Sequence, residues 1–169
     1  SASITPPYSA FDNKDYANLA NNYQSSTYRQ ELQEKYRWIE YHKWKLKART
    51  FTALSGNNKC FVLMTRVEMG LLGSYNSHQR SPFETYYMGG DGMSGYSSTY
   101  ATETIGLRGY DNGSLTPMGQ EGYAYSRFAM ELRYPLMFEN STQIYALAFL
   151  EGGNAWTDAS KFNLFDLKR

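Results

Sequence analysis

The sequence has little of several features that would mark other classes of protein. It contains a single cysteine, Cys60, in 169 residues, which excludes an internal disulfide framework and a cysteine zinc site. The net charge of +1 argues against a dedicated nucleic-acid binder. No run approaches the roughly 18 apolar residues that a membrane-spanning helix needs. With no linker-like segment to divide it, the chain is expected to be one domain or a piece of one.

Aromatic residues, in contrast, are abundant, with 16 tyrosines and 3 tryptophans. They fit the aromatic girdles of a transmembrane β-barrel, whose strands need only about 9 to 11 residues each and expose apolar side chains at alternate positions. The lack of a long apolar run therefore does not exclude a membrane protein. The same aromatic content also fits a soluble carbohydrate-binding β-sandwich.

Four segments show the two-residue period of β-strands. Within residues 37–54, 60–75, 123–136 and 142–156, apolar residues occupy one parity and charged residues the other. The first segment places Lys43, Lys45, Lys47 and Arg49 on one face, whereas a helix would scatter them around its surface. With a short β-prone piece that ends at Pro6-Pro7, the chain is predicted to hold about five antiparallel strands.

The first two long strands are predicted to form a hairpin with a defined register. Their charged residues have odd numbers in the first strand and even numbers in the second. Because a slip of one residue would exchange the two faces, paired positions must sum to an odd number of about 115. Lys47 is then expected to face Glu68.

The connections alternate between long and short. Residues 11–36, 76–121 and 157 onward are long, whereas 55–59 and 137–141 are short. Long loops on one side and short turns on the other are typical of outer-membrane barrels. A helical turn is predicted within the first long connection, at Thr27 to Lys35, after a Ser/Thr cluster. Five strands do not close a barrel, because the smallest have about 8.

The connection of residues 76–121, called the central loop below, carries its own packing residues and is expected to fold onto the sheet. Gly89-Gly90 permits a backbone turn that other residues would not tolerate. Leu107-Arg108-Gly109-Tyr110 then places one cation between two large apolar groups. This arrangement suggests a charge that is carried inward.

Other chemistry is weakly indicated. Glu131 and Glu151 resemble the carboxylate pair of a glycosidase only in being two glutamates flanked by aromatic residues. His42 and His78 lack ligand spacing for a metal. The aspartates of MGGDG and GYDNGS do not have the spacing of a helix-loop-helix calcium site and are better explained as turn residues. No catalytic residue, metal site or cofactor is therefore predicted, and the protein is not expected to be an enzyme.

Four motifs carry a family resemblance. FETYYMGGDG, IGLRGY, FAMELRYPL and ALAFLEGGNAW resemble the C-terminal part of the BamA family of outer-membrane β-barrel assembly proteins, over about residues 37 to 169. The family has Val-Arg-Gly-Phe where this chain has Leu-Arg-Gly-Tyr, which keeps the Arg-Gly centre. The resemblance implies an all-β fold: a fragment of an antiparallel transmembrane barrel of about sixteen strands. Residues 1–169 would form the partial barrel, and the loop of residues 76–121 would fold into the lumen.

The resemblance also implies how the loop is held. In the family, the loop arginine contacts acidic residues of the two following strands, which correspond here to Glu131 and Glu151. The implied anchor residues are Gly89, Gly90, Arg108, Gly109, Tyr110, Glu131 and Glu151. A guanidinium shared by two carboxylates is a strong, geometrically specific contact. The alternative is that Arg127 pairs with Glu151 while Arg108 is solvated.

The implied function is to fold and insert β-barrel proteins into the bacterial outer membrane through an opening barrel seam. The expected partners are unfolded outer-membrane proteins, accessory assembly lipoproteins and membrane lipids, with no nucleic acid. The seam strands and the periplasmic domains are expected to lie outside this chain. Two alternatives remain open: a two-partner-secretion transporter of the same superfamily, and a soluble carbohydrate-binding β-sandwich.

Overall fold

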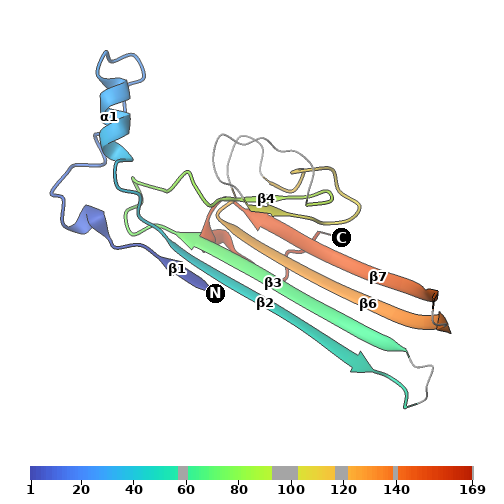
Figure 1. The fold of residues 1–169 in the computed structure, drawn as a ribbon. Helices are drawn as coiled ribbons and strands as arrows, with labels where there is room; N and C mark the ends of the chain where they lie inside the picture. Colours follow the sequence, from blue (N-terminus) through green and yellow to red (C-terminus); the bar gives the residue numbers. More distant parts are fainter. Residues whose placement is uncertain (57–60, 93–102, 117–121, 139–140, 169) are drawn as a thin grey trace.

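The structure is a computed structural model that describes residues 1–56, 61–92, 103–116, 122–138 and 141–168 (Figure 1). Its strands are β1 (Ala2–Ile4), β2 (His42–Ala53), β3 (Val62–Gly73), β4 (Tyr86–Met88), β5 (Glu103–Ile105), β6 (Ala124–Phe138) and β7 (Gln143–Trp156). The other elements of the described residues are the α-helix α1 (Tyr28–Lys35) and the 3-10 turns η1 (Tyr8–Ala10) and η2 (Ala159–Lys161). The predicted all-β class is confirmed. Within the described residues, no helix is both long and apolar enough to cross a membrane.

One antiparallel sheet forms the body of the protein, in the order β1-β2-β3-β6-β7. Lys47 pairs with Glu68, and His42 pairs with Gly73, so the predicted register of the hairpin is confirmed. We call the face that carries Lys47 and Glu68 the inner face and the opposite face the outer face. Continuing across the ladders, the inner face includes Arg127, opposite Glu68, and Glu151, opposite Ala129.

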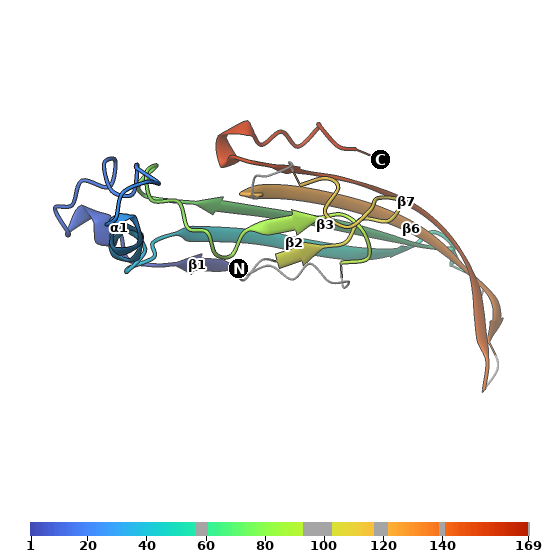
Figure 2. The same ribbon diagram turned by 90° about the horizontal axis from the view of Figure 1, so that it is seen from above.

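The two kinds of connection lie at opposite ends of the sheet, as predicted (Figure 1). β2 is joined to β3, and β6 to β7, by the short segments 54–61 and 139–142. The strand ends that the long segments 5–41 and 74–123 join lie at the other end, as does the end of β7 at Trp156. The predicted helical turn is confirmed as α1, which stands away from the sheet (Figures 1 and 2). Cys60 and parts of both predicted short turns lie outside the described residues.

The first long strand begins later than predicted, at His42 rather than at Arg37. The residues before it contact the segment after β1 instead of β3. The backbone N–H of Thr5 donates to the Tyr41 carbonyl at 3.0 Å, and the carboxylate of buried Glu40 accepts from Ser9 Oγ at 2.7 Å. These long-range contacts overrode the alternating pattern that continued upstream into residues 37–41.

β6 and β7 are the longest pair, and their ladder contains one irregularity. The register shifts between Pro135 and Met137, so β6 carries one extra residue there. Proline cannot donate to a ladder and is found at such bulges. The shift lies near the end with the short connection, where the sheet bends in Figure 2.

The outer face exposes large apolar side chains along its strands. Exposed examples are Trp44, Leu46, Leu136, Ile144 and Leu150. Single exposed apolar residues are ordinary on a soluble protein, whereas a face built from them indicates a partner or a lipid environment. The far edge of the sheet is joined by the tail, because Gly153 and Lys168 exchange backbone hydrogen bonds of 2.9 and 3.1 Å.

The described parts of the central loop pack against the inner face. Within the loop, β4 and β5 pair in parallel, with Tyr86 opposite Glu103. Figure 1 shows β4 across the end of the sheet where β3 finishes and β6 begins. A sandwich would place a second full sheet here, whereas the described residues show only this two-stranded pair. Residues 93–102 of the predicted loop, with Tyr96 and Tyr100, lie outside the described residues.

Candidate functional site: the anchored central loop

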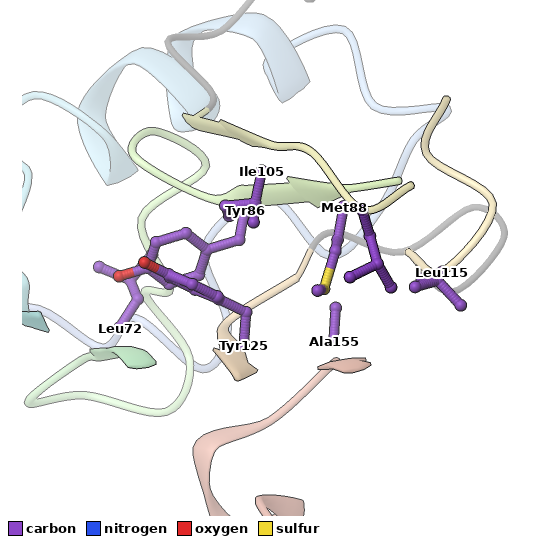
Figure 3. Packing of buried hydrophobic residues seen from close by; sticks show 8 residues of the cluster. Leu72, Tyr86, Met88, Ile105, Leu115, Tyr125 and Ala155 are labelled. Carbon is purple, nitrogen blue, oxygen red and sulfur yellow. The ribbon is translucent and has the colours of Figure 1, made fainter. Parts of the chain in front are cut away.

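A small apolar core lies between the central loop and the sheet (Figure 3). The loop contributes Tyr86, Met88, Ile105, Leu107 and Leu115, and the sheet contributes Leu72, Tyr125 and Ala155. Tyr86 and Tyr125 pack edge to face with ring centroids 4.6 Å apart, a geometry that adds to the area they bury. The loop therefore packs at a defined position on the sheet.

Two glycines of the sheet let the loop come this close. A Cβ added to Gly70 would collide with the Tyr125 ring and lie 2.7 Å from the Tyr86 hydroxyl. A Cβ added to Gly153 would collide with the Met88 methyl group and lie 2.8 Å from the Ser126 carbonyl oxygen. Both positions therefore require the smallest residue for packing reasons.

The Gly89-Gly90 pair forms the turn after β4. Both residues have positive φ, 129° and 71°, which residues with a Cβ rarely adopt. The Gly89 N–H donates to the Ile105 carbonyl at 2.9 Å, and the Gly90 carbonyl accepts from Leu107 N–H at 2.9 Å. A Cβ at Gly90 would also overlap the Asn112 side chain. This turn joins the start of the loop to the tetrapeptide that carries Arg108.

The Leu107–Tyr110 tetrapeptide places Arg108 at the inner face, and the residues on either side of it, Leu107 and Tyr110, pack in or against the loop core. Leu107 is fully buried in the loop core, and Tyr110 packs against that core while partly exposed. Gly109 has a φ of 87° with open space around it, so it is needed for backbone conformation rather than for room. The Arg108 side chain remains half exposed, at 51%.

The structure brings Arg108 together with both predicted glutamates. Its Nη2 atom lies 3.6 Å from Glu131 Oε1, and its Nε atom lies 3.9 Å from Glu151 Oε1. These are ion-pair distances, longer than a good hydrogen bond. The direct hydrogen bond comes from the Arg108 backbone N–H, which donates to Glu151 Oε2 at 3.3 Å. The guanidinium also lies over the Phe149 ring, 4.5 Å from its centroid.

The alternative partner, Arg127, is present as well. It lies between Glu151 at 3.3 Å and Glu68 at 3.5 Å, and Arg133 donates to Glu131. The glutamate side chains are 3% and 8% exposed for Glu151 and Glu131. Buried carboxylates of this kind need positive partners. Each glutamate therefore has one arginine from the sheet and shares Arg108 from the loop.

Sequence reasoning did not identify Glu84 and Glu103 as loop residues that contact the sheet. The Glu103 carboxylate lies 3.0 Å from Lys45 Nζ, and Glu84 contacts Lys43. The signal was present in the sequence, because the sheet carries a row of cations and these two acids flank the loop's short strands. What the pattern could not show was which charges meet.

The residues considered in the sequence for a glycosidase or metal site have other partners in the structure. Both candidate glycosidase carboxylates accept contacts from arginines. His42 accepts a hydrogen bond from Trp44 Nε1 at 3.2 Å and contacts the Tyr75 ring. No group of three His, Cys, Asp or Glu residues suited to a metal occurs among the described residues.

Comparison with known proteins gives one match. Residues 3–168 match the model of the Omp85 superfamily domain. No curated protein and no solved structure matches the chain.

Proposed function

This chain belongs to the Omp85 superfamily, and we propose that it is the loop-bearing part of a BamA-type insertase, which folds β-barrel proteins and inserts them into the bacterial outer membrane. The observation that supports this most is the central loop held on the inner face by Arg108, between Glu131 and Glu151. The match to the superfamily model and the BamA-like motifs around these residues support the same assignment.

The proposed mechanism involves no covalent chemistry and no cofactor. An insertase acts by offering unpaired strand edges on which incoming strands are templated. In such a mechanism this chain forms a rigid part of the barrel wall, with the central loop packed on its inner face. Other strands form the seam that opens. The loop core and the ion pairs on the inner face would keep the wall in one shape as the seam opens.

The exposed apolar outer face supports membrane lipids as one partner. An apolar face of this kind is stable in contact with lipid chains. The backbone N–H and C=O groups of the inner strands are hydrogen-bonded to neighbouring strands, as a hydrocarbon environment requires. We accordingly propose the outer membrane as the location. Unfolded outer-membrane proteins as clients, and accessory assembly lipoproteins, complete the proposed set of partners.

Depletion of the intact protein in its own cells tests the function. An insertase predicts a broad loss of folded β-barrel proteins from the outer membrane, measured by quantitative proteomics. Loss of a single secreted polypeptide, with other barrels unchanged, would instead identify a two-partner-secretion transporter, since the superfamily includes both classes. Release of the protein from membranes without detergent would contradict both.

Variants of the loop anchor test the site. Arg108→Ala should slow client assembly while the protein still reaches the membrane. Arg49→Ala is the matched control, because Arg49 is an inner-face arginine that faces Arg66 across the ladder rather than a carboxylate. Equal assembly rates in the two variants would contradict a role for the Arg108 anchor.

A further inference from the structure

The inner face holds the central loop at a second place, around Lys43 of β2. This lysine side chain is 4% exposed, which is unusual because lysine is rarely buried unless it is paired. Its ammonium group has three N–H donors. It donates hydrogen bonds to the Glu84 carbonyl at 3.0 Å and the Glu84 carboxylate at 2.8 Å, and it forms an ion pair with the Glu103 carboxylate at 3.1 Å.

These contacts join the starts of both loop strands to the sheet. Glu84 lies two residues before Tyr86, the first residue of β4, and Glu103 is the first residue of β5. The ammonium also lies 4.9 Å from the centroid of the Tyr86 ring, and the Glu103 N–H donates to the Thr85 carbonyl at 2.8 Å. One buried cation therefore contacts the two chain segments whose pairing makes the loop's core.

Backbone strain at Glu84 points the same way. Its φ is 67°, a left-handed conformation that costs a non-glycine residue energy and persists where surrounding contacts enforce it. Here the enforcing contacts are visible, because Lys43 binds both the carbonyl and the carboxylate of Glu84. The contact thus fixes a turn that Glu84 would not adopt by itself.

The rest of the lysine row shows that Lys43 is distinct. Along β2, the exposed fractions of Lys43, Lys45 and Lys47 rise from 4% to 26% and 55%. Lys47 Nζ is 4.0 Å from Glu103, at the limit of an ion pair, and a pair this exposed contributes little. The burial is therefore greatest at Lys43, which shares the Glu103 carboxylate with Lys45 at 3.0 Å and contacts Glu84 in addition.

We propose that Lys43 is a positioning residue that seats the β4–β5 pair of the central loop on the inner face, as a second anchor separate from Arg108. The two anchors have opposite polarity. At Lys43 a cation of the sheet holds two acids of the loop, and at Arg108 a cation of the loop meets two acids of the sheet. The seating itself does not depend on the proposed function, and only its consequence for client assembly rests on the insertase assignment.

Hydrogen exchange of the intact protein in detergent tests the seating. The reporter is the Glu103 amide, which is bonded to Thr85, and the reference is the set of β2–β3 ladder amides. Lys43→Met removes both hydrogen bonds to Glu84, while Glu103 keeps its contact with Lys45, so exchange of the reporter should speed up by more than tenfold. Lys47→Met, the matched control on the same face, should change it by no more than about threefold. Ladder amides should be unchanged in both variants.

A second variant keeps the test decisive if Lys43→Met does not fold. Glu84→Gln alters the same contact from the loop, where 43% of the side chain is exposed, and it should speed reporter exchange by about tenfold. Adding Glu84→Gln to a folded Lys43→Met protein should have little further effect, since the contact is already lost. Reporter exchange no faster in Lys43→Met than in Lys47→Met, or ladder amides that accelerate equally, would overturn the proposal. So would wild-type exchange in Glu84→Gln.

The assembly arm separates the seating from the function. Vesicles containing Lys43→Met protein should fold an unfolded β-barrel client more slowly than vesicles containing Lys47→Met protein. Faster reporter exchange, with client folding in wild-type vesicles no faster than in protein-free vesicles, would support the second anchor and contradict the insertase assignment. Unchanged reporter exchange with normal client folding would contradict the anchor and leave the assignment in place.

Discussion

Glu151 should matter more than Arg108 for holding the tip of the central loop. Glu151 has three contacts: it accepts hydrogen bonds from the Arg108 backbone N–H and from Arg127, and it forms an ion pair with the Arg108 guanidinium at 3.9 Å. Arg108→Ala removes only the guanidinium, because the backbone hydrogen bond at 3.3 Å remains possible in alanine. Glu151→Ala removes all three contacts and leaves Arg127, which is 14% exposed, with Glu68 as its ion-pair partner.

The two losses can be estimated from exposure and distance. Unit charges about 4 Å apart interact by about 4 kcal/mol at an effective dielectric constant of about 20 and by about 1 kcal/mol in water. Since 51% of Arg108 is exposed, screening brings its pairs near the lower figure. We expect Arg108→Ala to cost about 1 kcal/mol and Glu151→Ala about 3 kcal/mol, the lower end for breaking a buried pair.

Exchange of the amides that close the loop measures this difference. The Leu107 amide donates to Gly90, and the Gly89 amide donates to Ile105. At 1.4 kcal/mol for each tenfold change, Arg108→Ala should speed their exchange about fivefold and Glu151→Ala more than 100-fold. Glu151→Gln, which keeps the size and an acceptor oxygen but not the charge, should fall between them. An Arg108→Ala effect as large as that of Glu151→Ala would refute the reasoning.

Three further predictions follow from other parts of the structure. Gly90→Ala should destabilise the loop by at least about 1 kcal/mol more than Gly109→Ala does. Both glycines have positive φ, but only a Cβ at Gly90 would also collide with Asn112. Amide hydrogen exchange of the loop in the two variants measures the difference. A backbone hydrogen bond from Ser160, then the Arg80 side chain, lowers the pKa of Asp158 from 3.8 to about 2. A depressed carboxyl pKa stabilises the fold above the unfolded value and loses this effect as the carboxyl is protonated. The contact between Arg80 and the 157–161 turn should therefore weaken as pH falls from about 4 to about 2. Asp158→Asn should abolish this pH dependence, which hydrogen exchange of the Ser160 amide measures. Residues 1–169 alone should aggregate in water and require detergent, because the outer face is apolar and the sheet has open edges; a monodisperse monomer with a cooperative melt in detergent-free buffer would contradict this.

The parity of a few charged residues, with the position of the short turn, was enough to predict the two faces of the first hairpin and its register. Lys47 and Glu68 had to share a face, and side chains in a strand alternate strictly, so one pairing satisfied the whole hairpin. The alternating pattern did not locate the start of β2, because contacts from Thr5 and Ser9 decide where residues 37–41 go. The family motifs indicated Arg108, Glu131 and Glu151 as partners, and the structure shows that Arg127 and Arg133 share the same carboxylates.

The sequence by itself therefore determined the elements with a strong local period: the long strands, their faces, and the turn at Gly89-Gly90 that only glycine readily adopts. Tertiary structure alone decided which loop charge meets which sheet charge. Lys43 is 41 residues from Glu84, and Lys45 is 58 residues from Glu103. No local periodicity connects residues so far apart in the chain. Their meeting depends on how the apolar core of the loop seats on Gly70 and Gly153, where the absence of a side chain leaves room for it.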